Sequence, residues 1–145
     1  MCGIYLTNIP IYSKEVEQKL EKIRFRGPDN LGVVRKGNIS LGHLRLSILD
    51  LEERSNQPFT FEHLTLVYNG EIYNFKEVKN SLIQEGYSFE TTSDTEVLLK
   101  GYHAWGEKIL DRINGMFAFA VYDENKKTVF IARDRLGVKP LYYSW

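Results

Sequence analysis

Residues 116–122, MFAFAVY, are the feature of this sequence that most restricts its fold. The run is apolar at every position, but it is far shorter than the roughly 20 residues that a membrane-spanning helix needs. A strand that is apolar on both faces is buried on both, so it belongs to a sheet that is covered on each side. We therefore expect the sheet that contains residues 116–122 to lie between two other layers.

Other expected strands follow one another through turns instead of alternating with helices. Residues 31–36 and 39–49 predict a hairpin around Lys36-Gly37-Asn38, because glycine and asparagine tolerate the positive φ angles of tight turns. Further strands are expected at 3–9, 64–68, 128–134 and 141–145. This order is typical of antiparallel α+β proteins and not of doubly wound parallel sheets.

Three helices are expected to cover these strands. The first spans 14–25, where apolar residues recur at helical spacing, and it ends at Gly27-Pro28. Two later helices each begin at a capping box, in which a polar residue is followed three positions later by glutamate. The two boxes are Asn74 with Glu77 and Ser93 with Glu96. Two sheets packed face to face with helices outside satisfy both the hairpin order and the apolar run at 116–122.

The composition excludes several classes of function. The 145 residues include 19 basic and 19 acidic ones, so we expect no nucleic-acid-binding stripe and no polybasic membrane patch. The single cysteine rules out an internal disulfide and makes the reducing cytoplasm the expected compartment. His43, His63 and His103 lack the spacing of metal-ligand motifs, and we expect no metal site.

The single cysteine stands at position 2, directly after Met1. If Met1 is removed, Cys2 carries both a thiol and a free α-amine. A free thiol has an ordinary pKa of ~8.5 and needs a base at neutral pH, whereas an α-amine, with a pKa of ~7.7–8.0, has a substantial neutral fraction there. An N-terminal amine can therefore activate the nucleophile of its own residue. The alternative is that Cys2 is a small buried residue without chemistry.

Four residues elsewhere, three of them polar, fit a pocket for an amino acid that carries a side-chain amide. Asn69-Gly70 follows a predicted strand but leads into a helix, so a hairpin turn fits poorly, and an amide beside a glycine N–H can form a two-donor oxyanion hole. Arg45 lies among apolar residues, where it either pairs internally or binds a ligand carboxylate. Asp94 can hold an ammonium group, or can merely complement a helix dipole.

Motifs along nearly the whole chain carry a family resemblance. They are MCGI, RGPDN, GHLRLSILDL, NQPF, YNGEIYN, SDTEVLL, GMFAFAVYD and RDRLGVKPLYY, between positions 1 and 143. In these residues the chain resembles class II glutamine amidotransferases, which are N-terminal-nucleophile (Ntn) hydrolases, and it is most similar to the glutaminase domain of asparagine synthetase. The resemblance implies a four-layer α/β/β/α sandwich of two antiparallel sheets, here C-terminally shortened, over residues 1–145.

The resemblance also implies a role for individual residues. Cys2 matches the nucleophile and its α-amine the base, while Asn69 and Gly70 match the oxyanion hole. Arg45 matches the residue that binds the α-carboxylate of glutamine, and Asp94 the residue that binds its α-ammonium group. The remaining positions that match the substrate pocket are Leu46, Ser47, Ile48, Leu49 and Glu71. The sequence RDRLGVKP shows no chemistry of its own, so Arg133, Asp134 and Arg135 are taken as structural or interface residues.

The expected activity is hydrolysis of L-glutamine to glutamate and ammonia through a Cys2 thioester, with the ammonia destined for an amide-forming step as in asparagine synthesis. No cofactor or metal is expected in this chain, because it lacks a nucleotide signature; ATP and Mg²⁺ belong to a separate synthetase domain or subunit. Whether the chain is a fragment, a short homologue or a subunit stays open, as does self-association. The alternative function is a catalytically silent glutamine-binding or interaction module of the same fold.

Overall fold

The apolar run at 116–122 lies in β6 (Gly115–Asp123), an inner strand of a four-stranded antiparallel sheet. The computed structural model describes residues 1–144. Within this part of the chain the sheet has the order β4 (Phe59–Phe61), β5 (Leu64–Ile72), β6, β7 (Thr128–Arg133). Strand β6 pairs with β5 along all nine residues, from Leu64 opposite Asp123 to Ile72 opposite Gly115.

A second sheet covers one face of the first. It contains β1 (Gly3–Thr7), β2 (Asn30–Lys36) and β3 (Ile39–Arg45), in the order β1-β3-β2, all antiparallel. The expected hairpin between β2 and β3 is confirmed, and Gly37 in its turn has φ of 63°. Apolar side chains of β3, Ile39 and Leu41, pack between the sheets against Val67, Ala120 and Tyr122.

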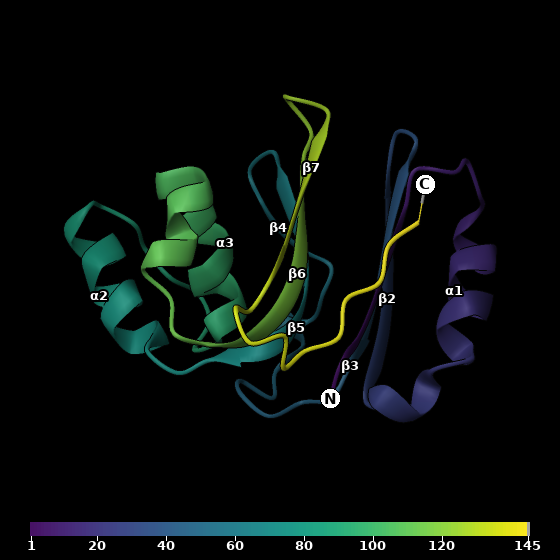
Figure 1. The fold of residues 1–145 in the computed structure, drawn as a ribbon, viewed down its shortest axis with the longest axis horizontal. Coiled ribbons are helices and arrows are strands. Elements are labelled where there is room, and N and C mark those ends of the chain that lie inside the picture. Colours follow the sequence, from purple (N-terminus) through teal and green to yellow (C-terminus); the bar gives the residue numbers. More distant parts are fainter. Residues whose placement is uncertain (145) are drawn as a thin grey trace.

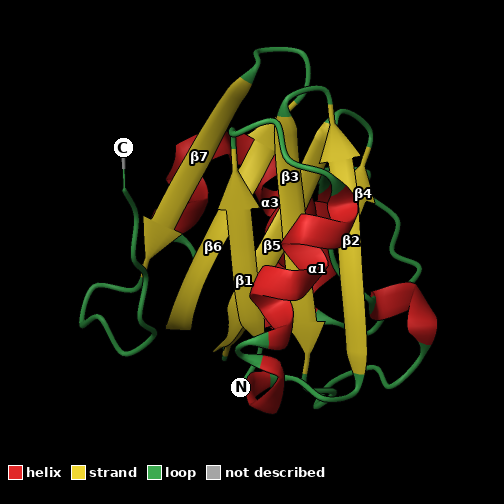
Figure 2. Ribbon diagram, turned by 90° about the vertical axis from the view of Figure 1, so that its right-hand side faces the viewer, coloured by secondary structure: helices red, strands yellow, loops and turns green. Residues whose placement is uncertain are grey.

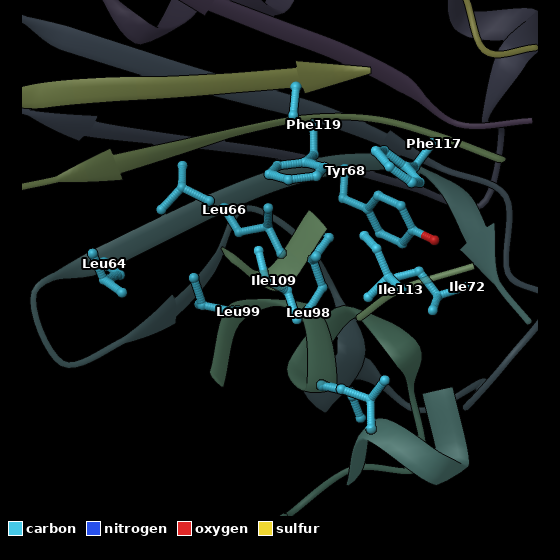
Figure 3. Packing of buried hydrophobic residues seen from close by; sticks show 14 of the residues in the cluster. Leu64, Leu66, Tyr68, Ile72, Leu98, Leu99, Ile109, Ile113, Phe117 and Phe119 are labelled. Atoms are coloured by element: carbon cyan, nitrogen blue, oxygen red, sulfur yellow. The ribbon is translucent and has the colours of Figure 1, made fainter. Parts of the chain in front are cut away.

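Helices form the two outer layers (Figure 1). Helices α2 (Phe75–Gln84) and α3 (Asp94–Trp105) cover the β4–β7 sheet, and Figure 3 shows side chains of β5 packed against Leu98 and Leu99 of α3. Helix α1 (Ser13–Glu21) lies across the outer face of the β1–β3 sheet, where Val16 and Leu20 are fully buried (Figure 2). The four-layer α/β/β/α sandwich is therefore confirmed. Among residues 1–144, no helix is both long and apolar enough to cross a membrane.

Several expected boundaries are wrong. Helix α1 ends at Glu21 instead of 25, and a 3₁₀ turn follows at Arg24–Arg26. The chain then passes so close to β3 that a Cβ at Gly27 would lie 2.5 Å from the carbonyl oxygen of Leu44. Strand β4 was not expected, and residues 141–144, which were expected to begin a strand, form none; Trp145 lies outside the described residues.

The first predicted capping box does not form, and the second forms only in part. Asn74 makes no side-chain cap; instead it donates to the carbonyl of Arg112 at 2.9 Å and accepts from the backbone N–H of Asn114 at 2.8 Å. It thus joins the segments that precede α2 and β6. Ser93 does cap α3 by accepting from the N–H of Thr95. The carboxylate of Glu96 binds Lys100 and backbone N–H groups of the preceding loop instead of Ser93.

Candidate active site

A pocket of about 130 Å³ opens where the end of β5 meets the start of the chain. It is bordered by Met1 and Cys2, by the loop that follows β3, and by the first turn of α3. Nine of the ten residues predicted from the sequence line it, namely Cys2, Arg45, Leu46, Ile48, Leu49, Asn69, Gly70, Glu71 and Asp94. Ser47 is not among the lining residues; its backbone N–H donates to Asp29 Oδ2 at 2.7 Å.

The register of β1 on β3 places Cys2 in this pocket. Gly3 pairs with Leu44, so Cys2 stands beside the residues that follow β3. The backbone N–H of Leu46 donates to Cys2 Sγ at 3.4 Å, and the thiol lies 3.8 Å from the carbonyl oxygen of Leu46. Arg26 Nε donates to the carbonyl of Cys2 at 3.1 Å. The sulfur and the backbone of Cys2 are therefore both anchored.

Met1 is bonded to the backbone nitrogen of Cys2, which would be a free α-amine if Met1 were absent. It lines the pocket, and its Sδ accepts a 3.0 Å contact from Lys139 Nζ. With Met1 present, the nitrogen of Cys2 belongs to a peptide bond and cannot act as a base. The thiol and the pocket are thus formed with Met1 present, but the free amine is not.

Asn69 and Gly70 lie inside β5 and not in a hairpin turn. Because side chains alternate along a strand, Asn69 shares the face of Val67, which packs against the other sheet. This face is the one turned toward the strand that carries Arg45. Position 70 must be glycine for reasons of space, since a Cβ there would lie 2.2 Å from the carbonyl oxygen of Met116 on β6.

Arg45 is buried and bonds to the loop that follows it. Of the two alternatives left open by the sequence, internal pairing and binding of a ligand carboxylate, the structure shows the first. Its Nη1 donates to the carbonyl of Glu52 at 2.9 Å and to Asn56 Oδ1 at 2.8 Å, and its Nη2 donates to the carbonyls of Leu49 and Asp50. These acceptors are all neutral. Within the described residues no carboxylate forms an ion pair with Arg45, so its charge remains available to an anionic ligand in the pocket that it lines.

Asp94 begins α3 and is fixed by β5. Its Oδ2 accepts from the phenol of Tyr68 at 2.8 Å and from the backbone N–H of Ile72 at 3.0 Å. The pKa of Asp94 is raised overall: burial, the largest influence, raises it, the two hydrogen bonds lower it, and the nearby carboxylate of Glu71 raises it. Two carboxyl groups, Asp94 and Glu71, therefore share one side of the pocket and favour a cationic group there.

The loop between Leu46 and Ser55 is tied to the start of α3 by Asp50. One of its carboxylate oxygens accepts from the backbone N–H of Thr92 at 2.7 Å, and the same oxygen pairs with Arg54 at 3.2 Å. Burial raises the pKa of Asp50, but the hydrogen bond from Thr92 and the charge of Arg54 outweigh it and lower the value to about 2. Asp50 thus holds this loop over the pocket while ionised.

Sequence reasoning missed several lining residues, among them three buried polar side chains. Gln57 accepts from the backbone N–H of Tyr68 at 2.6 Å and donates to Thr95 Oγ1 at 3.3 Å, so the NQPF motif carried a signal that was not used. Ser55 is buried, and its Oγ has no partner within residues 1–144; no sequence pattern singled it out. Lys139 is 4% exposed and reaches the pocket from the segment after β7.

The segment that delivers Lys139 is held by Asp134, one of the residues expected to be structural. Asp134 Oδ2 accepts from the backbone N–H groups of Phe117 and Lys139, and Oδ1 accepts from that of Val138. Burial raises the pKa of Asp134, but these N–H donors lower it overall, so the carboxylate stays ionised. Asp134 therefore fixes the chain on which Lys139 enters the pocket.

His43 connects the two sheets behind the pocket. It is fully buried in β3, and its Nε2 lies 3.2 Å from the carbonyl oxygen of Tyr68 on β5. Its Nδ1 has no hydrogen-bond partner within residues 1–144. Burial and the charge of Arg45 lower the pKa of His43 to about 4, against the opposing effect of the Tyr68 carbonyl. The imidazole is therefore neutral at physiological pH.

Fold and pocket together define an Ntn hydrolase, with its candidate nucleophile beside the chain start and between two sheets. A family model described as a glutamine amidotransferase domain matches residues 1–145. The chain therefore belongs to the class II glutamine amidotransferase domain family.

Proteins of known identity agree with this assignment. The chain is 39% identical to glutamine-hydrolyzing asparagine synthetase 3 of Bacillus subtilis, over 99% of this chain and 25% of that protein. It is 40% identical to putative glutamine-hydrolyzing asparagine synthetase 2 of Methanocaldococcus jannaschii, over 100% of this chain and 32% of that protein. The chain thus spans about a quarter to a third of the length of these relatives.

A solved structure of the same class extends the comparison. Glutamine phosphoribosylpyrophosphate amidotransferase from B. subtilis, complexed with ADP and GMP, matches with a TM-score of 0.60 and 29% identity. The match covers 72% of this chain and 25% of that chain. The likeness thus extends to an amidotransferase whose name refers to phosphoribosylpyrophosphate and not to asparagine.

Proposed function

We propose that this chain, once Met1 is removed, hydrolyses L-glutamine to glutamate and ammonia. The observation that carries the proposal is the position of Cys2 Sγ in one pocket with Asn69, Gly70, Arg45 and Asp94. A thiol, an oxyanion hole, a cation and an anion are the groups needed to bind and cleave an amino acid with a side-chain amide.

The reaction proceeds in two halves. The free α-amine of Cys2 takes the thiol proton, and the thiolate attacks the amide carbon of glutamine. Asn69 and Gly70 stabilise the oxyanion of the tetrahedral intermediate, and the amine returns the proton to the leaving ammonia. Water, deprotonated by the same amine, then attacks the thioester, so that the C–S bond breaks and glutamate is released with the thiol restored.

The ends of the pocket orient the substrate. Arg45, whose present partners are neutral, attracts the α-carboxylate of glutamine, and Asp94 with Glu71 attracts its α-ammonium group. Ser55, whose buried Oγ lacks a partner within the described chain, is placed to hydrogen-bond a polar ligand in the same pocket. Such a contact would compensate the cost of burying its hydroxyl.

An amide-forming synthetase then uses the ammonia, as the names of the curated relatives suggest. ATP and Mg²⁺ would be bound by that synthetase part and not by the glutaminase pocket, whose groups need neither. The exposed apolar side chains of Leu136 and Val138, in the segment fixed by Asp134, and of Tyr142 beyond it are a surface that such a part can cover. A free cysteine nucleophile suits the cytoplasm.

A silent glutamine-binding module of the same fold is the second candidate. One observation favours it: four hydrogen bonds from Arg45 go to the loop after β3, so this side chain has a structural role whether or not glutamine binds. The two functions differ in turnover and not in binding.

The test begins with an intact mass of the purified chain, which reports whether Met1 is present. The processed chain is then incubated with glutamine, aspartate and Mg-ATP, and glutamate, asparagine and AMP are measured separately, with Cys2→Ala as the control. We expect glutamate from the processed chain alone, and neither asparagine nor AMP. Glutamine binding without glutamate, in a processed and folded sample, would establish the silent module instead.

A further inference from the structure

Glu62, His63 and His103 form a cluster of metal-ligating side chains at the other end of β5 from the pocket. Glu62 and His63 occupy the turn between β4 and β5, and His103 lies in the last turn of α3. Each offers one ligand atom, and these atoms lie within 4.8 Å of one another. With a rise of about 3.4 Å per residue, the six positions from His63 to Asn69 separate this cluster from the pocket by about 20 Å.

The distances within the cluster match a tetrahedral ion. Glu62 Oε2 lies 3.0 Å from His103 Nε2 and 3.9 Å from His63 Nδ1. Ligands that are each about 2.0–2.2 Å from a tetrahedral Zn²⁺ are about 3.3 Å apart. The observed spacings lie on both sides of this value, so small side-chain rotations suffice to place an ion between the three groups.

In both histidines, the ring nitrogen that faces away from Glu62 lies near an oxygen atom of another residue. His103 Nδ1 lies 2.7 Å from the phenol oxygen of Tyr87, and His63 Nε2 lies 3.9 Å from Asp123 Oδ2. A histidine ligand commonly donates its outer N–H to a carboxylate or another acceptor, which fixes the tautomer and turns the other nitrogen to the metal.

The outer partners are themselves held in place. Asp123 Oδ1 accepts from the backbone N–H groups of Asn125 at 3.0 Å and Lys126 at 2.9 Å, which leaves Oδ2 facing His63 and the Lys126 ammonium group at 3.5 Å. The ring of Phe61 packs edge-on against His103 at 5.1 Å. These contacts orient the imidazoles without blocking the site, since the side chains of His63 and His103 remain about a quarter exposed.

The charges around the cluster favour a cation. Imidazoles that ligate a metal are neutral, so Glu62 gives the ligand set one negative charge, and Asp123 adds another that Lys126 offsets in part from 3.5 Å. The buried cation Lys100 lines the same surface hollow as Glu62 and His103, and its ammonium group is neutralised by Glu96 at 2.6 Å. Two imidazole nitrogens and one carboxylate oxygen suit Zn²⁺ and similar divalent transition metals better than Mg²⁺ or Ca²⁺, which prefer oxygen.

We propose that Glu62, His63 and His103 bind one divalent transition-metal ion of the Zn²⁺ type, with water completing the coordination. The site is independent of glutamine hydrolysis and stabilises the β4–β5 turn against α3. The sequence predicted no metal site because His63 and His103 are 40 positions apart and only the fold brings them together.

The test measures metal binding on the Cys2→Ala chain, so that the thiol near the chain start cannot contribute. Zn²⁺ affinity is obtained by competition with a chromophoric chelator, and Co²⁺ serves as a spectroscopic probe of tetrahedral coordination. We expect one ion per chain, tetrahedral Co²⁺ bands, and a melting temperature that rises with Zn²⁺. His63→Ala and Glu62→Gln should each weaken the affinity at least about tenfold.

Glu85→Gln is the matched control, because Glu85 is a nearby carboxylate that bonds Trp105 and not the cluster. It should leave the affinity unchanged. Glu62 is more than half exposed, so Glu62→Gln keeps the test valid even if a histidine variant unfolds. Unchanged Zn²⁺ affinity in Glu62→Gln and His63→Ala, or the absence of binding in the parent chain, would overturn the proposal.

Discussion

The phenol of Tyr68 donates a 2.8 Å hydrogen bond to Asp94 Oδ2, and this bond joins β5 to the first turn of α3. Both groups are buried, and the backbone N–H of Ile72 donates to the same oxygen. The bond therefore fixes the negative side of the pocket to the strand that carries Asn69 and Gly70. The carboxylate of Asp94 therefore both lines the pocket and holds α3 against β5.

Asp94→Asn should separate these two roles. The amide oxygen can still accept from Tyr68 and Ile72, but the charge is lost, so the KM for glutamine should rise roughly 10- to 100-fold, as expected for a hydrogen bond between charged groups. Because the pKa of Asp94 is raised in the fold, its contribution to stability falls as pH rises from the ordinary value of 3.8 through the raised pKa. At neutral pH the variant should thus be at least as stable as the parent. Steady-state kinetics with urea unfolding check both parts, and a clearly less stable variant would contradict this account.

Asn69→Ala removes an oxyanion donor while leaving the substrate's charged groups bound. We expect kcat to fall by ~10²–10³ with a much smaller change in KM. Asn69 lies opposite Ala118 in the ladder, and its side chain is not part of the backbone pairing, so β5 should persist. Glutaminase kinetics on the processed chain measure the effect. A large rise in KM at constant kcat would assign Asn69 to binding instead.

Arg45→Ala should raise KM and also lower stability, because the guanidinium holds the loop after β3 as well as facing the pocket. Loss of several hydrogen bonds from one charged donor is expected to cost about 2–4 kcal/mol. Asn56→Ala is the matched control, since it removes one loop partner of Arg45 without removing the charge. It should reduce stability by less and leave KM nearly unchanged. Equal KM values for Arg45→Ala and the parent would remove Arg45 from substrate binding.

The buried His43 makes stability depend on pH. Its pKa is about 4 in the fold against 6.5 unfolded, so the unfolded chain binds more protons between these values and stability is lost as pH falls from 6.5 to 4. The full effect is on the order of 3 kcal/mol. His43→Gln places an amide N–H near the carbonyl of Tyr68 but does not titrate. Urea unfolding at several pH values should show a shallower slope in this window for the variant; an identical slope would place the titration elsewhere.

The parts of the fold that depend on local sequence were predictable. The two-sided apolar run of β6 indicated a covered sheet, and glycine at position 37 indicated the β2–β3 turn. Asn69-Gly70 was correctly separated from a hairpin because a helix follows it. These predictions rest on hydrophobic periodicity and turn conformation, which neighbouring residues determine.

Features that depend on distant segments were not predictable. Asn74 has the sequence of a cap, but a better set of partners, Arg112 and Asn114, lies almost 40 residues away and takes its amide. Ser55 and Lys139 enter the pocket only because separate loops fold over it. In each case the residue and its sequence neighbours give no signal of the observed role, because that role depends on contacts with segments that are distant in the sequence.

Because β5 and β6 approach closely at Gly70, both the packing of the two strands and the proposed oxyanion hole depend on glycine at this position. The backbone φ at this position does not demand glycine, but the carbonyl of Met116 leaves no room for a methyl group. Any larger residue would push β5 away from β6 and would therefore displace Asn69, the preceding residue of β5. A variant library at position 70 therefore cannot yield clones that keep the fold and lose only the chemistry, whereas position 69 can.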